Sequence, residues 1–457
     1  MTTQPRKILA AFVATVAASS ALVAGGGATT AASAADQQRV NLAFTARSFG
    51  ASIYTNGISI KQARLARTEL GCTKTVGKKT NSAALTPPAL GDAIALEGVK
   101  SQNVTYKYAN GRTGARAVNR IAKVTLGTED SPRLVLNGFK SVSDAYRQNG
   151  RFNTASSFTF DGISVSGLPD NGPLGDLLDL IGGGAADVLE QLGGGETIEI
   201  PGLARLSLAP STRTVTQGAR GSAEQETSGL QVRLLVGNLA AVSLGNTRAR
   251  VSQPVPAGVF QGGTAALQGD LLNDAAPFGA TNQTLIPCEG TFGKKVVQNR
   301  PSGGIATPLV VDVTDARSEI TGNQSGRTGA ASTVAKVGSV SILPPELAPL
   351  LPTVAVEDIT SRVAVNGNPS QGKVTTKFGS SVGTLIISGE EVPVPKPGQT
   401  RSYENGAVEV TRRILKKGAS GAANTALRVK YIPNVVNSGL DPITLDIGHS
   451  ALYFKKG

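Results

Sequence analysis

A cysteine followed at a fixed distance by a lysine pair occurs twice in this chain. The segments Cys72–Lys79 and Cys288–Lys295 both fit the pattern C-x-x-T-x-G-K-K, and nearly half of the chain separates them. Thiols can join in a disulfide, and neighbouring ammonium groups attract phosphates and carboxylates. The pattern therefore predicts two kinds of site, a cross-link and a set of contacts to an anionic ligand.

The sequence contains only two cysteines, and they occupy equivalent places in the two segments. If the repeats pack about a pseudo-twofold axis, equivalent residues near that axis face each other. A disulfide between Cys72 and Cys288 would then join the repeats. The alternative is that each cysteine is a separate buried thiol.

Lys78, Lys79, Lys294 and Lys295 are the candidate contacts to an anionic ligand. The whole chain has a formal net charge of +13, which favours anionic partners such as teichoic-type polymers, acidic glycans or lipid headgroups. Another surface protein is the alternative partner. Basic residues are spread over both repeats without interleaved aromatic residues, so nucleic acid is not expected as a partner. The alternative is that these lysines protect exposed strand edges against pairing with other chains.

Histidine is nearly absent from this sequence, and only two cysteines are present. His449 is the single histidine, so a Ser-His-Asp or Cys-His catalyst would have to use it. One histidine and two cysteines in separate repeats do not supply the usual four ligands of a zinc site. The segment Gly71–Lys79 resembles a phosphate-binding loop, but its glycine spacing is wrong and Lys79 stands where a magnesium-binding hydroxyl belongs. We therefore expect no catalytic residue, no metal site and no cofactor.

Residues 1–34 have the features of a secretory signal peptide. Arg6 and Lys7 precede an apolar run, and Ala32-Ser33-Ala34 fits an A-x-A cleavage site. Removal of this segment takes away those two charges and leaves a formal net charge of +11. The final residues carry neither a hydrophobic tail nor a sorting motif. We expect a secreted or non-covalently held cell-surface protein without a transmembrane segment in its mature chain.

The elements that must position these residues are strands. Alternating apolar and polar residues, as in Leu230–Leu234 and Leu427–Tyr431, recur between Gly, Pro and Asn residues throughout the chain. Strands with one polar side are typical of antiparallel sheets packed as a sandwich. We predict an all-β fold of two tandem, repeat-related antiparallel β-sandwich modules, residues 35–256 and 257–457.

The two repeats share a second motif and differ in one place. Gly111–Ala115 returns as Gly326–Ala330, in the same order relative to the cysteines. Only the first repeat contains a leucine-rich stretch, at about residues 172–194, in which apolar residues fall at helical spacing around a run of glycines. This stretch predicts a short helical insert in a loop of the first module.

Four segments of the first repeat follow one another in a recognisable order. Phe44–Ala51 reads F-T-A-R-S-F-G-A, the lone Cys72 and the Gly111–Gly114 turn come next, and Ile198–Leu203 forms an I-x-I-P-G-L strand. This order resembles a family of actinobacterial exported surface proteins of the choice-of-anchor P type. The resemblance implies an all-β envelope or secreted protein without enzymatic chemistry. Such proteins commonly carry a C-terminal anchor, and none is visible in this sequence.

Three classes of function follow from these observations. A non-catalytic protein that binds or adheres to anionic surface polymers predicts a contiguous basic or apolar patch in register on both repeats. A self-assembling envelope component predicts exposed strand edges or flat apolar faces. An exported hydrolase, the least favoured class, predicts a cleft in which polar side chains converge on His449. The sequence favours the first two classes and does not separate them.

Overall fold

The computed structural model describes most of the chain beyond residue 37. The described residues are 38–55, 66–84, 94–127, 133–166, 188, 192, 196–200, 204–209, 211–234, 240–271, 276–306, 310–343, 352–432 and 442–457. The predicted signal segment lies outside them. Strands dominate the described part of the chain, and the prediction of an all-β fold built from antiparallel sandwiches is confirmed.

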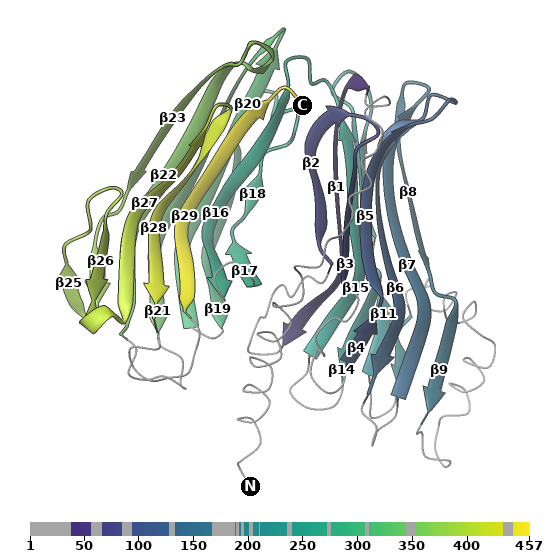
Figure 1. Cartoon of the computed structure of the whole chain (residues 1–457), viewed down its shortest axis with the longest axis horizontal. Helices are drawn as coiled ribbons and strands as arrows, with labels where there is room; N and C mark the ends of the chain where they lie inside the picture. The colour runs from purple at the N-terminus through teal and green to yellow at the C-terminus, as the bar shows by residue number, and fades with distance from the viewer. Residues whose placement is uncertain are drawn as a thin grey trace.

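The first sandwich consists of two antiparallel sheets, A and B, formed by residues 39–252 (Figure 1). Sheet A has the order β10 (Ile198–Ile200), β11 (Ala204–Leu208), β14 (Leu230–Leu234), β15 (Ala240–Ser252), β1 (Arg39–Thr55) and β2 (Thr68–Thr75), while β13 (Ser222–Thr227) joins β12 (Thr212–Thr216) to β15. Sheet B has the order β3 (Lys79–Ala84), β5 (Val99–Lys107), β6 (Thr113–Leu126), β7 (Arg133–Gln148) and β8 (Arg151–Thr159), with β4 (Ile94–Glu97) on β6 and β9 (Gly162–Ser166) on β7.

The second sandwich, sheets C and D, is formed by residues 259–455. Sheet C has the order β17 (Ala276–Thr281), β16 (Val259–Leu271), β29 (Ile443–Lys455), β28 (Gly421–Tyr431), β27 (Val408–Gly418) and β26 (Thr400–Tyr403), with β18 (Thr284–Leu285) on β16. Sheet D has the order β19 (Val296–Ala306), β20 (Val310–Ser325), β21 (Thr328–Leu343), β22 (Val354–Asn368), β24 (Leu385–Ile387) and β25 (Glu390–Val392), with β23 (Lys373–Ser381) on β22. Two 3₁₀ turns, η3 (Pro369–Gln371) and η4 (Glu404–Gly406), lie between strands.

The two sandwiches repeat one topology. In each of them the first strand pairs with the last, β1 with β15 and β16 with β29. The last strands also share a left-handed glycine, Gly245 (φ 67°) and Gly448 (φ 64°). A Cβ at Gly245 would lie 2.2 Å from the ring of Phe139, and one at Gly448 would lie 2.8 Å from Ile359. Close approach of the opposite sheet at the same place in both copies supports a duplication.

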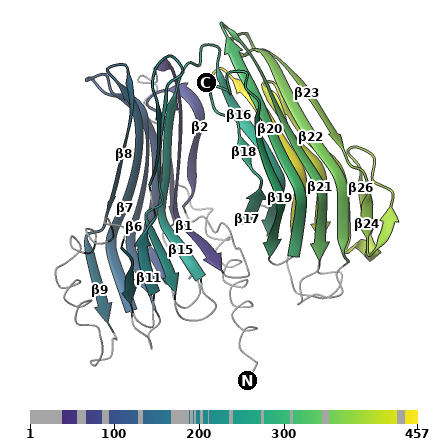
Figure 2. The same ribbon diagram turned by 180° about the vertical axis from the view of Figure 1, so that it is seen from behind.

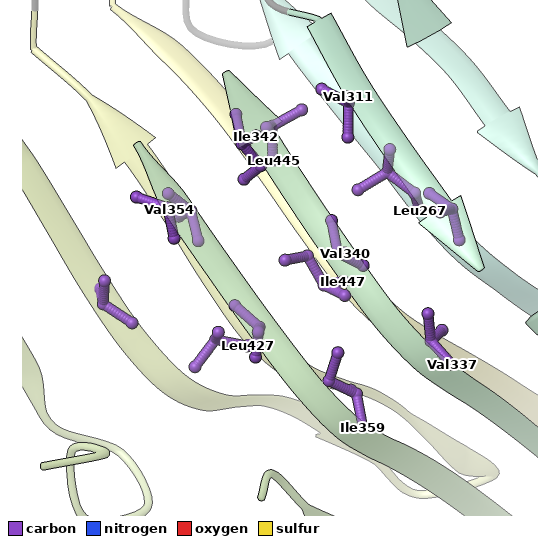
Figure 3. Packing of buried hydrophobic residues seen from close by; sticks show 14 of the residues in the cluster. Leu267, Val311, Val337, Val340, Ile342, Val354, Ile359, Leu427, Leu445 and Ile447 are labelled. Atoms are coloured by element: carbon purple, nitrogen blue, oxygen red, sulfur yellow. The ribbon is translucent and has the colours of Figure 1, made fainter. Parts of the chain in front are cut away.

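The cores lie between the sheets of each sandwich. Side chains of β20, β21 and β22 in sheet D point toward those of β16, β28 and β29 in sheet C, as the labelled residues of Figure 3 show. Complete burial of each such Val, Leu or Ile contributes about 1.5–3 kcal/mol. The first sandwich has a matching cluster. The alternation predicted for Leu230–Leu234 and Leu427–Tyr431 is that of β14 and β28.

Each core also contains buried hydroxyl and amide side chains that pair with one another. Ser143 Oγ donates a hydrogen bond to Thr227 Oγ1 at 2.9 Å in the first sandwich, and Asn424 Nδ2 donates one to Ser361 Oγ at 3.0 Å in the second. Such pairs satisfy polar groups that would be costly to bury alone.

Most of the helical insert predicted at residues 172–194 lies outside the described residues. Within that stretch the structure describes only Val188 and Leu192. Both are helical and buried in the core of the first sandwich.

The two sandwiches lie side by side and meet at one end, where the chain passes from β15 to β16 and where the C-terminus also lies (Figures 1 and 2). This meeting point is called the junction below.

Candidate functional site

A disulfide crosses the junction. Cys72 in β2 is bonded to Cys288, which follows β18, with their Cα atoms 5.5 Å apart. Cys288 is buried against Ala43, Val255 and Val259. The prediction that these two cysteines join the repeats is confirmed, and the alternative of two separate thiols is excluded.

Polar contacts hold the junction beside the disulfide. The buried carboxylate of Glu289 accepts hydrogen bonds from the Arg250 guanidinium and from Ser252 Oγ (2.6 Å). Lys74 Nζ donates to the carbonyl oxygen of Val255 at 2.6 Å. Gln261 Nε2 donates to the carbonyl oxygen of Cys72 at 2.7 Å. Glu289 and Gln261 belong to the second sandwich and bond to residues of the first, while Lys74 bonds to the connection between them, so these contacts fix the placement of one sandwich against the other.

The first predicted lysine pair is divided between two surfaces. Lys78 lies in the connection between β2 and β3, where burial lowers its pKa and the positive charges of Arg39 and Lys455 lower it further. Lys79 begins β3 and is exposed. It lies opposite Val104 of β5, and Val104 lies opposite Arg116 of β6, so Lys79 shares the outer face of sheet B with Arg116.

The second predicted pair is partly neutralised. Lys295 Nζ lies 2.6 Å from a carboxylate oxygen of Glu319, and Arg317 Nε lies 2.7 Å from the other. The hydrogen bond from Lys295, and then the charge of Arg317, hold the pKa of Glu319 below its usual range. Lys294 is exposed and forms no salt bridge with any residue that the structure describes.

Three basic residues that were not predicted as a site stand in one row on the outer face of sheet B. Lys100 of β5 lies opposite Arg120 of β6, and Arg120 lies opposite Lys140 of β7. All three side chains are exposed. Within the described part of the chain, no acidic side chain forms a salt bridge with any of them. Like charges directly opposite each other on neighbouring strands destabilise a sheet, so this row has an energetic cost that folding alone does not explain.

The acidic side chains that form salt bridges on this face pair with basic residues outside the row. Glu97 pairs with Lys123 at 3.1 Å. Asp144 pairs with Arg112 at 2.8 Å and with Arg116 at 2.6 Å. A further acid, Asp161, follows β8 and lies against Gly138 of β7. The row is therefore left as a concentration of positive charge, which we call the basic row (Lys100, Arg120 and Lys140).

In the second sandwich the equivalent row has one of its positive charges neutralised. The two rows can be matched because a residue with positive φ precedes each by two positions, Gly98 before Lys100 and Asp315 before Arg317. The equivalent row is Arg317, Lys336 and Thr360. Its Arg317 is paired with Glu319, whose counterpart in the first sandwich is the uncharged Gln102. The basic row is therefore a property of the first module and is not imposed by the shared fold.

One sequence signal could have located part of the basic row. Asn110-Gly111 is a strong hairpin signal, and Gly111 does adopt a left-handed conformation with φ 78°. A turn centred there fixes the register of β5 on β6 and places Lys100 opposite Arg120. A second Asn-Gly pair, Asn137-Gly138, lies between Arg120 and Lys140, but it falls inside β7 and does not connect two strands, so the same signal would misplace the turn that brings Lys140 beside Arg120.

His449 lies in the last strand, β29, beside a threonine hydroxyl. Its Nδ1 shares a hydrogen bond with Thr425 Oγ1 at 3.0 Å, and burial lowers its pKa. Asp446, the carboxylate closest to it in the sequence, is held by Arg428 at 2.7 Å. The described residues also contain no group of three or more His, Cys, Asp and Glu side chains placed to hold a metal ion. No helix in the described part of the chain is long and apolar enough to cross a membrane.

Comparisons with known proteins add little to this picture. No family model and no curated protein matches the chain. A solved structure titled "Crystal structure of lipopolysaccharide binding protein" aligns over 86% of this chain and 100% of its own, at 10% identity and a TM-score of 0.13. That TM-score is too low to bear on the fold or the function.

Proposed function

We propose that this chain is an exported, non-catalytic protein that binds anionic polymers of the cell envelope through the outer face of sheet B. The observation that carries the proposal is the basic row. Three cations lie in register across β5, β6 and β7 without acidic partners among the described residues. A polyanion bound over the row would reduce the electrostatic repulsion among these cations. The binding free energy is therefore more favourable than it would be for cations that do not repel one another in the free protein.

Two further features support an exported, extracellular role. The signal-like segment 1–34 predicts secretion. A disulfide between residues that are far apart in sequence suits an oxidising compartment, because thiols in the cytosol are kept reduced. We place the protein outside the cell, released or held by its own contacts to envelope polymers.

Self-assembly is a second candidate, favoured by one observation. The second sandwich exposes the apolar side chains of Leu285, Val296 and Val297, the last two on the edge strand β19. The same strand contains Pro301, which cannot donate a ladder hydrogen bond, and it follows Lys294 and Lys295. Proline and lysine at an edge are devices that prevent strand pairing, so we rank self-assembly second.

The test compares two variants that lose the same charge. In the first variant Lys100, Arg120 and Lys140 become glutamine. In the control, three exposed lysines of sheet D become glutamine, namely Lys336, Lys373 and Lys377. Both mature proteins are titrated against isolated cell envelopes at low salt, and their bound fractions are measured by co-sedimentation.

A cation near an anionic surface contributes about 1 kcal/mol, so the basic-row variant should bind roughly 100-fold more weakly than the unmodified protein. The sheet D control should bind nearly as well as the unmodified protein. Equal losses in both variants would show that only net charge matters and would contradict a site on sheet B. Concentration-dependent assembly of the unmodified protein without envelopes would favour the second candidate.

A further inference from the structure

A cluster of aromatic and arginine side chains lies on the outer face of sheet B, at the β5–β6 turn. Tyr106 of β5 and Tyr146 of β7 flank Gly114 of β6 in one row. The chain contains only seven tyrosines, and Tyr108 is a third one in this cluster. Its ring stacks on that of Tyr106, with centroids 4.6 Å apart and planes 23° from parallel.

The side chains of the cluster are held in place by hydrogen bonds to one buried carboxylate, that of Asp144. Asp144 is buried and accepts a hydrogen bond from Tyr106 Oη at 2.5 Å. Burial, and then the negative charge of Asp144, raise the pKa of Tyr106 well above its usual range, so the phenol keeps its proton. The same carboxylate accepts hydrogen bonds from Arg112 and Arg116. The Arg112 guanidinium also lies 3.6 Å from the centroid of the Tyr146 ring.

The ring of Tyr108 and the guanidinium groups of Arg112 and Arg116 are the parts of the cluster that a ligand could contact. Tyr108 is 45% exposed although its ring is stacked on Tyr106, so part of Tyr108 stays accessible to a ligand. Arg112 and Arg116 bind Asp144 through Nε or Nη2, and the Nη1 groups of both make no hydrogen bond with any described residue. Two guanidinium groups share one carboxylate, which leaves one positive charge in excess.

The second sandwich shows that the fold does not need this cluster. The positions equivalent to Tyr106, Gly114 and Tyr146 are Asn323, Ala330 and Asn366, which pair in the same register. The positions equivalent to Arg116 and Asp144 are Ser332 and Ala364. The strands therefore pair in the same register without aromatic, arginine or carboxylate side chains at these five positions, and the cluster is a feature of the first module alone.

We infer that Tyr108, Arg112 and Arg116 form a subsite for a sugar ring that bears a carboxylate or phosphate group. The apolar face of a pyranose can stack on the ring of Tyr108, while the free N–H groups of the arginines take the anion in a planar, bidentate geometry. Tyr106 and Asp144 act as positioning residues, because they hold the platform before the ligand arrives and so reduce the entropy lost on binding.

The subsite continues the basic row. Tyr106 follows Lys100 by six residues on β5, which is about 20 Å along a strand. A chain of several acidic sugars lying along β5 and β6 would reach from the platform to the basic row. This inference rests on the proposed function and specifies it, since it names an acidic polysaccharide as the polymer that is bound.

The experiment uses two soluble polymers and single substitutions in the whole mature protein. Polygalacturonate has rings and carboxylates, and polyphosphate has charge without rings. Tyr108→Ala removes the platform, and Tyr108→Phe keeps it. Leu285→Ala is the matched control, because it removes another exposed apolar side chain from the second module. Urea unfolding of each variant checks that the fold is retained.

We expect Tyr108→Ala to weaken polygalacturonate binding by about three- to tenfold, the usual value of an aromatic contact, and to leave polyphosphate binding unchanged. Tyr108→Phe and Leu285→Ala should bind like the unmodified protein. Unchanged polygalacturonate binding by Tyr108→Ala, or an equal loss for both polyanions, would overturn the sugar subsite and leave the basic row standing. Failure of the unmodified protein to bind either polyanion would overturn the proposed function together with the subsite.

Discussion

Lys100 and Arg120 lie directly opposite each other on β5 and β6, with both side chains exposed on the outer face of sheet B. Lys140 continues the same row on β7. Opposed like charges on a sheet lower stability by about 0.2–1 kcal/mol for each pair. Such a row lowers the free energy of unfolding, and a loss of this kind is expected where the charges bind a ligand.

The first prediction concerns the central charge of the basic row, which should lower stability and favour binding. Arg120→Thr removes the central charge and places a strand-favouring residue in β6, so the free energy of unfolding should rise by about 0.5–1 kcal/mol while polyanion binding weakens. Urea unfolding and a binding titration measure the two effects. Lys336→Thr in the second sandwich is the control and should give a smaller gain, because Glu319 already balances Arg317. Loss of stability in Arg120→Thr would contradict the prediction.

The second prediction concerns the disulfide. Replacing both Cys72 and Cys288 by serine should lower the stability of the chain by about 2–4 kcal/mol, the usual contribution of a native cross-link. Each sandwich should remain folded, because each has its own core and its own closing strand pair. Thermal unfolding followed by circular dichroism checks both points. An unchanged unfolding midpoint, or loss of all β structure at low temperature, would be the contrary result.

The third prediction concerns the buried carboxylate at the junction. Among the described residues, Glu289→Ala leaves Arg250 with only Glu224 as its acidic partner and leaves Ser252 Oγ without its acceptor. We expect a loss of about 3 kcal/mol in the free energy of unfolding. Glu69→Ala breaks the exposed pair with Arg67 and should cost less than about 1 kcal/mol. Similar losses in both variants would mean that the junction contact is no stronger than a surface pair.

The fourth prediction is a pH dependence that His449 imposes. Burial lowers the pKa of His449 below its ordinary value of 6.5. The unfolded chain therefore binds this proton more readily than the folded one, and stability falls as the pH drops below about 6.5 toward the lowered pKa. His449→Gln, which can still hydrogen-bond to Thr425, should lose less stability between pH 7 and pH 5, as measured by urea unfolding. Parallel pH profiles would assign the dependence to other groups.

The features that depend on spacing along the chain were predictable from the sequence. The duplicated cysteine motif led to the disulfide, because an equivalent position in each repeat of a pseudo-twofold pair can meet its counterpart. Period-2 stretches such as Leu427–Tyr431 led to strands, because alternate side chains of a strand face the core.

The basic row was not predicted, because it depends on strand register. Lys100, Arg120 and Lys140 lie far apart in the sequence and meet only when β5, β6 and β7 pair. The adjacent lysines Lys78 and Lys79 indicated a ligand contact because they are neighbours in the sequence. Neighbouring residues where a strand begins seldom share a face, and these two belong to different surfaces.

The tyrosine and arginine cluster escaped prediction for a related reason. The low aromatic content of the chain, 4% of its residues, argues against a sugar-binding platform when it is averaged over the sequence. Pairing of β5, β6 and β7 nevertheless gathers Tyr106 and Tyr146 in one row, and the turn adds Tyr108. Composition carries no information about such a concentration.

The most direct test of binding through sheet B is the salt dependence of affinity for polygalacturonate. The dissociation constant of the mature protein is measured between 25 and 400 mM salt, beside the variant in which Lys100, Arg120 and Lys140 are glutamine. Exposed charges are screened over about 10 Å at 0.1 M salt, so the affinity of the unmodified protein should fall steeply and that of the variant only slightly. Equal slopes for the two proteins would contradict a site at the basic row.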